Sequence, residues 1–254
     1  DWSRAAGREG IAEEAGVVLL PISTNIVTAL GVGVCWAQQW QGSVLAAAGH
    51  VLASRLSQVM ISASHDIWSV VPYGSHPVLD PNYSSSDLRI RHHGITLSRL
   101  SKAKLVADWD TALQNLRVCN QIPYGKKTEQ GTLNCGKCEK CVKTMLALLA
   151  LGVLQKTRTF AATDVHAEAL PVLGMEINGD VSDFYDELIP ILRERQRADL
   201  LPAIRKIVKS GRRAQKIEAW KAHARDVDMK YLGAGLMRLK RMMQTGKSIP
   251  MQGM

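Results

Sequence analysis

Long apolar runs are missing from this 254-residue sequence. No stretch of about eighteen consecutive apolar residues occurs, and the longest candidates, residues 42–56 and 142–154, are interrupted by His, Arg or Lys. The first residues, Asp1 to Arg4, also lack the apolar segment of a secretory signal. We therefore expect a cytoplasmic protein without a membrane segment.

Acidic residues are scarce toward the C-terminus. Residues 191–254 contain 16 Lys and Arg against 5 Asp and Glu, whereas the rest of the chain contains 16 against 18. This asymmetry predicts an anionic partner, either a nucleic acid or an acidic protein face, and a solvated helical surface explains it equally well. Few aromatic residues interleave these cations (Trp220 and Tyr231 are the candidates), which argues against stacking on single-stranded bases.

Helical and strand patterns alternate along the first part of the chain, as in an α/β fold with a parallel sheet. Helices are expected over residues 2–15, 38–57, 98–108 with Ser98 as N-cap, 142–152, and 182–245 with breaks at Gly211 and Gly233. Strands are expected over residues 17–20, 59–61 and 88–91.

Four of the five cysteines form a tight pattern, Cys119-x15-Cys135-x2-Cys138-x2-Cys141. In a C-x-x-C turn the backbone N–H groups fold back toward the first sulfur, and Gly136 permits the tight turn. Cys141 is expected at the start of a helix, whose N-terminus favours a negative thiolate. Four thiolates in a tetrahedral set predict a closed, structural zinc site.

An iron–sulfur cluster is the main alternative at these cysteines, because C-x2-C-x2-C with a distant fourth cysteine is also a ferredoxin-like arrangement. The usual Cys-Pro is absent, since Asn120 follows Cys119. The odd count and close spacing disfavour disulfides, and unligated thiols are a weak interpretation for three cysteines within seven residues. Cys35, alone in an apolar stretch, is interpreted as a core residue.

Polar residues follow the expected strand 59–61, at the position where ligands bind in open α/β sheets. Ser64, His65 and Asp66 have the residue types of a catalytic triad, but neighbours in sequence cannot point at one another as a triad requires. We interpret the turn-rich segment 64–80 as a ligand-lining loop, with a loop tied down by its own side chains as the alternative. Its candidate substrate contacts are Ser64, His65, Asp66, Tyr73, Ser75, His76 and Asp80.

The remaining polar candidates carry weaker signals. His92-His93-Gly94 is interpreted as a turn, because no carboxylate stands at metal-ligand spacing. His50, on an apolar helix, is interpreted as a satisfied core residue. Arg99 and Lys102 lie three residues apart on one helix face, from which Lys102 can reach a phosphate; a solvated surface explains either one equally well.

The order of these parts resembles that of a known family. A strand ending in Ser62-Ala-Ser-His-Asp66, a Pro-rich loop, a helix with Lys102 and then Cys-Gly-Lys-Cys-Glu-Lys-Cys are similar to the 7-cyano-7-deazaguanine synthases of the ATP-pyrophosphatase (PP-loop) superfamily. The resemblance covers roughly residues 2–152 and is specific at the cysteine motif. It implies a doubly wound parallel (Rossmann-like) sheet, with the four clustered cysteines as zinc ligands.

The resemblance also implies a chemistry. In that family ATP with Mg²⁺ activates a carbonyl or carboxyl group as an adenylate, and amine attack then expels AMP. It implies an ATP-dependent ligase or synthase that releases AMP and pyrophosphate, with Asp66 and Lys102 as catalytic candidates and a small-molecule or macromolecular acyl substrate. The sequence GSHPVLDP over residues 74–81 differs from the family's usual sequence in this loop, which implies a different substrate.

The family's nucleotide loop, S-G-G-x-D-S, is absent from the sequence, so we expect it upstream of Asp1, and this chain to be the C-terminal two-thirds of a longer product. Residues 1–155 would form the α/β domain, without its first strand and nucleotide loop but with the zinc segment 119–141. Residues 156–254 would form a basic helical region. The alternatives are a catalytically inactive, zinc-stabilised binding module and a nucleic-acid-binding protein that uses the basic helices; a homo-oligomer is left open.

Overall fold

The computed structural model describes residues 8–29, 36–122, 126–174 and 181–236. Its elements in chain order are α1 (Glu9–Glu14), α2 (Ile26–Ala29), the π-helix η2 (Trp36–Trp40), α3 (Gln41–His50), β1 (Gln58–Ser62), the 3-10 helix η3 (Asp80–Tyr83), β2 (Arg89–His93), α4 (Arg99–Ala107), α5 (Asp110–Gln114), α6 (Glu139–Leu151), the 3-10 helices η4 (Leu154–Lys156) and η5 (Ala167–Gly174), α7 (Val181–Glu194), the 3-10 helix η6 (Ala198–Leu200) and α8 (Leu201–Tyr231). None of the helices in these ranges combines the length and the apolarity that a membrane span requires.

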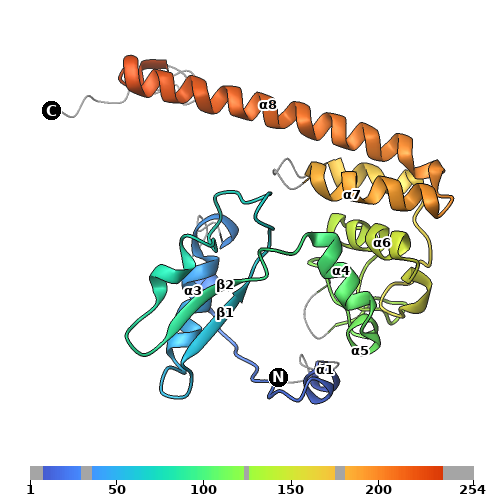
Figure 1. Cartoon of the computed structure of the whole chain (residues 1–254), viewed down its shortest axis with the longest axis horizontal. Helices are drawn as coiled ribbons and strands as arrows, with labels where there is room; N and C mark the ends of the chain where they lie inside the picture. Colours follow the sequence, from blue (N-terminus) through green and yellow to red (C-terminus); the bar gives the residue numbers. More distant parts are fainter. Residues whose placement is uncertain (1–7, 30–35, 123–125, 175–180, 237–254) are drawn as a thin grey trace.

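The strands form a small parallel sheet. β1 pairs with β2 from Gln58 opposite Arg89 to Ser62 opposite His93, and α3 lies beside the pair (Figure 1). Buried Ile61 and Ile90 pack with Leu88 and with Ala46 of α3. The fold is therefore mixed α/β with two parallel strands, and the doubly wound sheet stays a prediction.

The expected strand over residues 17–20 is wrong. This segment is in neither helix nor strand, and the side chain of Val18 is 93% exposed. A strand needs a hydrogen-bonded neighbour, and in the part of the chain that the structure describes none pairs with it. Of the helix expected over residues 2–15, α1 is the described part, and residues 1–7 lie outside the described residues.

The main hydrophobic core lies among the helices. One buried cluster joins residues between Leu100 and Val208, so its packing continues across residue 155. It contains Leu148 of α6, Leu188 of α7 and Ile204 of α8, none of which has measurable exposure. In Figure 1, α8 lies along α7 and its C-terminal part extends past α7.

Some helix ends follow the sequence signals and others do not. α3 ends at His50, seven residues before the expected end, and α7 ends at Glu194, where no break was expected. The Ser98 hydroxyl accepts the Ser101 N–H at 3.1 Å and caps α4, and Gly152 ends α6 with φ +75°. The helix break expected at Gly211 is wrong, because α8 continues through this residue. A glycine costs a helix interior about 1 kcal/mol, which the core contacts of the preceding turn, such as buried Ile207, outweigh. Gly233 does follow the end of α8.

Arg197 ties the segment before η5 to η6. Its guanidinium donates to the carboxylates of Asp164 and Asp199 and to the Val165 carbonyl at 2.8 Å. Burial raises the pKa of Asp164, but the Arg197 hydrogen bond and the Val165 N–H outweigh it and lower that pKa; Arg197 also lowers the pKa of Asp199.

A pH dependence of stability follows from this group. Because the folded-state pKa values are depressed, the stabilisation is present above the ordinary Asp pKa of about 4 and is lost as the pH falls through the folded values. Asp164 is 41% exposed, so solvent limits the effect, and Asp164→Asn is expected to cost about 0.5 kcal/mol at pH 7 and less at pH 3. Urea unfolding at both pH values measures this, with Asp87→Asn as the exposed control. An equal cost at both pH values would contradict the assignment.

Candidate metal centre and polar cluster

Four cysteine thiols converge at the start of α6. Cys138 is the N-cap residue of α6 and Cys141 lies in its first turn, while Cys135 precedes the helix and Cys119 lies in the segment after α5. All four Sγ atoms lie within 4.8 Å of one another, with Sγ–Sγ distances of 3.3 Å (Cys138–Cys141), 3.8 Å (Cys135–Cys141) and 4.0 Å (Cys119–Cys138). A tetrahedral ion with Zn–S bonds of about 2.3 Å separates its sulfurs by about 3.8 Å. These thiols can therefore hold a metal ion such as zinc.

Backbone N–H groups point at two of these sulfurs, as the C-x-x-C pattern predicts. The Cys138 N–H donates to Cys135 Sγ at 3.3 Å, and the Gln121 N–H donates to Cys119 Sγ at 3.3 Å. Gly136 has φ +68°, a conformation that L side chains rarely adopt, so glycine is required for this turn. The N–H groups of these turns thus donate to the sulfurs of Cys119 and Cys135 and stabilise them as thiolates, the form that binds a metal ion.

Asn134 joins the two cysteine turns. Its side chain is buried, and its Oδ1 accepts the N–H groups of Val118 at 2.8 Å and Cys119 at 3.1 Å. Its Nδ2 donates to the carbonyls of Leu116 at 2.8 Å and Thr159 at 3.1 Å. The Asn134 side chain therefore holds the backbone of Cys119 close to Cys135, which follows Asn134 in the sequence. The sequence reasoning missed Asn134, whose only signal is its place immediately before the C-x-x-C motif.

The four thiols differ in acidity. For Cys119 burial raises the pKa, but the hydrogen bonds from the backbones of Cys135, Ile122 and Gln121 outweigh burial and lower the pKa to about 6. Burial raises the pKa of Cys138 and of Cys141. These N–H groups thus favour the thiolate form of Cys119, while Cys138 and Cys141 must lose protons when a metal ion binds.

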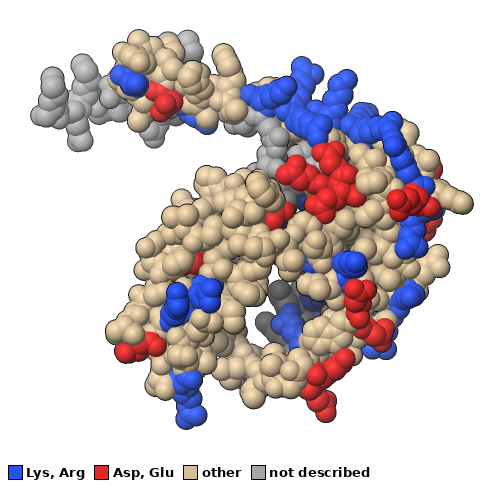
Figure 2. All heavy atoms as spheres, viewed as in Figure 1, with Lys and Arg blue, Asp and Glu red and all other residues tan. Residues whose placement is uncertain are grey.

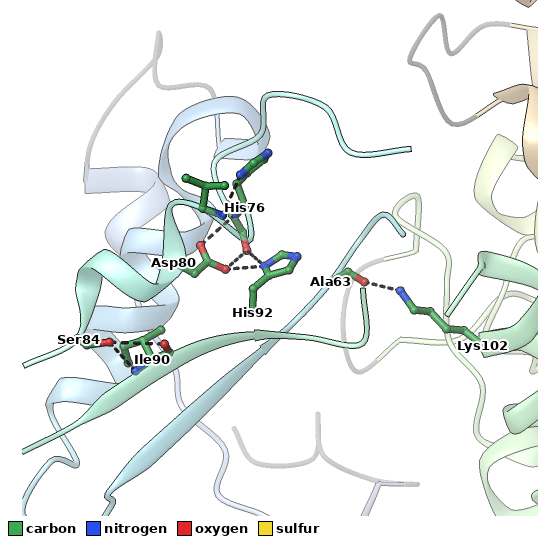
Figure 3. Close-up of polar contacts among 9 residues, drawn as sticks. Ala63, His76, Asp80, Ser84, Ile90, His92 and Lys102 are labelled. Atoms are coloured by element: carbon green, nitrogen blue, oxygen red, sulfur yellow. Dashed lines mark hydrogen bonds and ion pairs between the residues drawn. The ribbon is translucent and has the colours of Figure 1, made fainter. Parts of the chain in front are cut away.

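A second polar cluster lies at the carboxyl ends of the two strands. Asp80, at the start of η3, is fully buried, and its Oδ2 lies 2.7 Å from both the Ser75 hydroxyl and His92 Nδ1 (Figure 3). Its Oδ1 accepts the His76 N–H at 3.1 Å. A carboxylate here accepts three hydrogen bonds when His92 carries its proton on Nδ1, and this tautomer leaves the lone pair of His92 on Nε2.

The cluster packs against the first turn of α3. The Gly42 N–H donates to the Gly74 carbonyl at 2.7 Å, and a Cβ on Gly42 would lie 2.5 Å from that carbonyl oxygen and 2.6 Å from Asp80 Oδ1. No larger residue fits at Gly42 without moving backbone or the buried carboxylate. α3, the loop and β2 therefore fix Asp80 from three sides.

The structure brings together three of the predicted substrate contacts, Ser75, His76 and Asp80. The others lie elsewhere on the loop: the rings of His65 and Tyr73 meet edge to face at 5.6 Å, and Ser64 is exposed.

Both catalytic candidates make structural contacts within the protein. Asp66 Oδ1 accepts the N–H groups of Trp68 at 3.0 Å and Ser69 at 2.9 Å, so this carboxylate closes a turn. Lys102 Nζ donates to the Ala63 carbonyl at 3.0 Å and joins α4 to the end of β1 (Figure 3).

His92 is the cluster residue that the sequence reasoning missed. The interpretation of His92-His93-Gly94 as a turn is wrong for the two histidines, because both belong to β2. Side chains two apart on a strand share a face, and Ile90 is buried, so period-two alternation places His92 inward as well. His50, interpreted as a satisfied core residue, is partly buried, and its Nε2 lies 2.7 Å from the Tyr83 carbonyl oxygen. Cys35 lies outside the described residues.

Comparisons with family models, with curated proteins and with solved structures find no match for this chain.

Proposed function

We propose that this chain is part of an ATP-dependent, adenylate-forming enzyme of the 7-cyano-7-deazaguanine synthase-like type. It would activate a carboxyl or carbonyl group for C–N bond formation and release AMP and pyrophosphate. The observation that carries this proposal is the buried cluster of Ser75, Asp80 and His92 at the carboxyl ends of parallel strands, where α/β enzymes bind their ligands. The resemblance at the cysteine motif supports it.

The cluster has the chemistry that amide formation requires. An amine that attacks an acyl adenylate must lose a proton, and the Nε2 lone pair of His92 would accept it. Asp80, bonded to Nδ1, would hold this tautomer and stabilise the imidazolium that forms. In Figure 3 the far side of the His92 ring is turned away from Asp80. The phosphates of ATP with Mg²⁺ would be held by the nucleotide loop expected upstream, and catalysis would depend on positioning and charge stabilisation.

We also propose that the four cysteines hold one Zn²⁺ as a structural ion. A tetrahedral set of four thiolates has no open position for a substrate or water. The ion would fix Cys119 and Cys135 against the start of α6. α6 contacts α4, whose Lys102 reaches the end of β1, so the metal site would also support the polar cluster.

Calorimetric titration of ATP with Mg²⁺ into the product of the complete gene tests the enzyme proposal. We expect micromolar binding that is lost when the segment upstream of Asp1 is deleted, because that segment would supply the phosphate-binding N–H groups. Pyrophosphate release in the presence of candidate carboxylic acids would then identify the acyl substrate. No binding at millimolar ATP would contradict the proposal and favour a zinc-stabilised binding module.

A further inference from the structure

α8 carries a run of cations where it packs beside α7. Residues 205–216 contain six Lys and Arg and no acidic residue. Four of them, Arg205, Lys209, Arg212 and Lys216, are spaced by four, three and four residues, so they lie along one side of the helix. Figure 2 shows Lys and Arg side chains gathered along this helix.

A cleft of about 500 Å³ lies between α7 and α8 along this run. Asp186 and Ile189 line it from α7, and α8 contributes Arg205, Val208, Lys209, Arg212, Arg213 and Lys216. Arg212 forms an ion pair with Asp186 at 2.5 Å. Among the side chains that the structure describes, no carboxylate pairs with the other four cations of the cleft.

These unpaired cations repel one another. Like charges three and four residues apart on a helix destabilise it, and Asp186 offsets only one of them. A multivalent anion along the cleft would remove this repulsion. A protein partner is less suited, because protein interfaces have an apolar centre, and the residues of this run that face outward are Lys, Arg and Ser.

We propose that the cleft and the cations of residues 205–216, here called the α8 stripe, bind the phosphate backbone of a nucleic-acid duplex. The stripe is about 16 Å long at 1.5 Å per residue. Along the duplex axis each strand presents a phosphate about every 3.4 Å, so a stripe of this length faces several phosphates, whereas a pyrophosphate or a single nucleotide spans only part of it. Among the residues that the structure describes, no aromatic side chain lines the cleft, so it offers no platform for single-stranded bases.

Fluorescence anisotropy with labelled 20-base-pair DNA and RNA duplexes, and with the matching single strands, tests the proposal. The four unpaired cations that line the cleft, Arg205, Lys209, Arg213 and Lys216, predict a slope of about −3.6 for log affinity against log salt. Affinity for the duplex is therefore expected to fall about 150-fold between 50 and 200 mM NaCl. The two duplexes distinguish DNA from RNA as the source of the backbone.

Two variants test the site in opposite directions. Lys209→Glu with Arg213→Glu is expected to weaken binding at least tenfold and to make the slope shallower by about two. Asp186→Asn releases Arg212, so binding should tighten and the slope should steepen by about one, which a folding defect does not mimic. Lys104→Glu with Arg158→Glu, the same charge change on exposed residues outside α8, is the matched control and should leave the slope unchanged.

Several results would overturn the proposal. These are no duplex binding at 50 mM NaCl, tighter binding of the single strands, an unchanged slope in the Lys209→Glu, Arg213→Glu variant, or displacement of the duplex by stoichiometric pyrophosphate. Binding at the α8 stripe does not depend on ATP binding upstream, so either proposal can fail while the other stands.

Discussion

Replacing Cys138 with serine is expected to release the metal ion and to lower the melting temperature by about 6–12 °C. The Cys138 sulfur lies 3.3 Å from that of Cys141 and 4.0 Å from that of Cys119, so its loss opens the tetrahedral set. In a structural site the binding free energy of the ion is also folding free energy. We expect a loss of about 3 kcal/mol in the free energy of unfolding, and each kcal/mol corresponds to about 2–4 °C for a domain of this size.

Metal analysis and thermal unfolding measure this together. The unaltered protein should contain about one zinc per chain, and Cys138→Ser far less. Cys35→Ser makes the same chemical change at the cysteine that is not part of the Cys119-x15-Cys135-x2-Cys138-x2-Cys141 motif, and it should retain zinc. A brown, iron-containing protein would show that the four cysteines hold an iron–sulfur cluster instead of zinc. An unchanged melting temperature in Cys138→Ser would contradict a structural role for the site.

The cysteine site was predictable from the sequence because its information is local. The spacing of Cys135, Cys138 and Cys141 fixes two sulfurs on a turn and one on the first turn of a helix, whatever the rest of the fold does. The position of Cys119 was predictable only as the fourth member of the set. The residue that holds Cys119 in place, Asn134, was not predictable, because its bonds to Leu116 and Thr159 join segments distant in sequence.

Strands were less predictable than helices, because a strand depends on its neighbours. The segments that became β1 and β2 were expected, and each found a partner in the other. Residues 17–20 are more apolar than either strand, yet they find no such partner among the residues that the structure describes, and they stay exposed. The same dependence explains His92: its role rests on Asp80, which reaches it through a loop and not through any spacing within β2. The cap of α4 was predicted correctly, because the Ser98 hydroxyl accepts the N–H of Ser101, only three residues away.

Replacing Asn134 with leucine is expected to lower zinc affinity by about 10–100-fold and to reduce the free energy of unfolding by about 3 kcal/mol. Leucine has a similar size but leaves the buried N–H groups of Val118 and Cys119 and the carbonyl of Leu116 without their partner. Buried polar groups that lose a hydrogen bond cost about 1–3 kcal/mol each, and some of these will relax toward water. Because none of the four sulfurs is changed, any loss of zinc affinity reports the positioning of Cys119.

Competition with a zinc-sensitive dye measures the affinity, and urea unfolding measures the stability. Asn82→Leu removes an exposed amide with a single hydrogen bond to the Val78 carbonyl, so it is the matched control and should change neither quantity appreciably. If Asn134→Leu destabilised the protein but bound zinc as tightly as before, the amide would support the fold near the site without positioning its ligands.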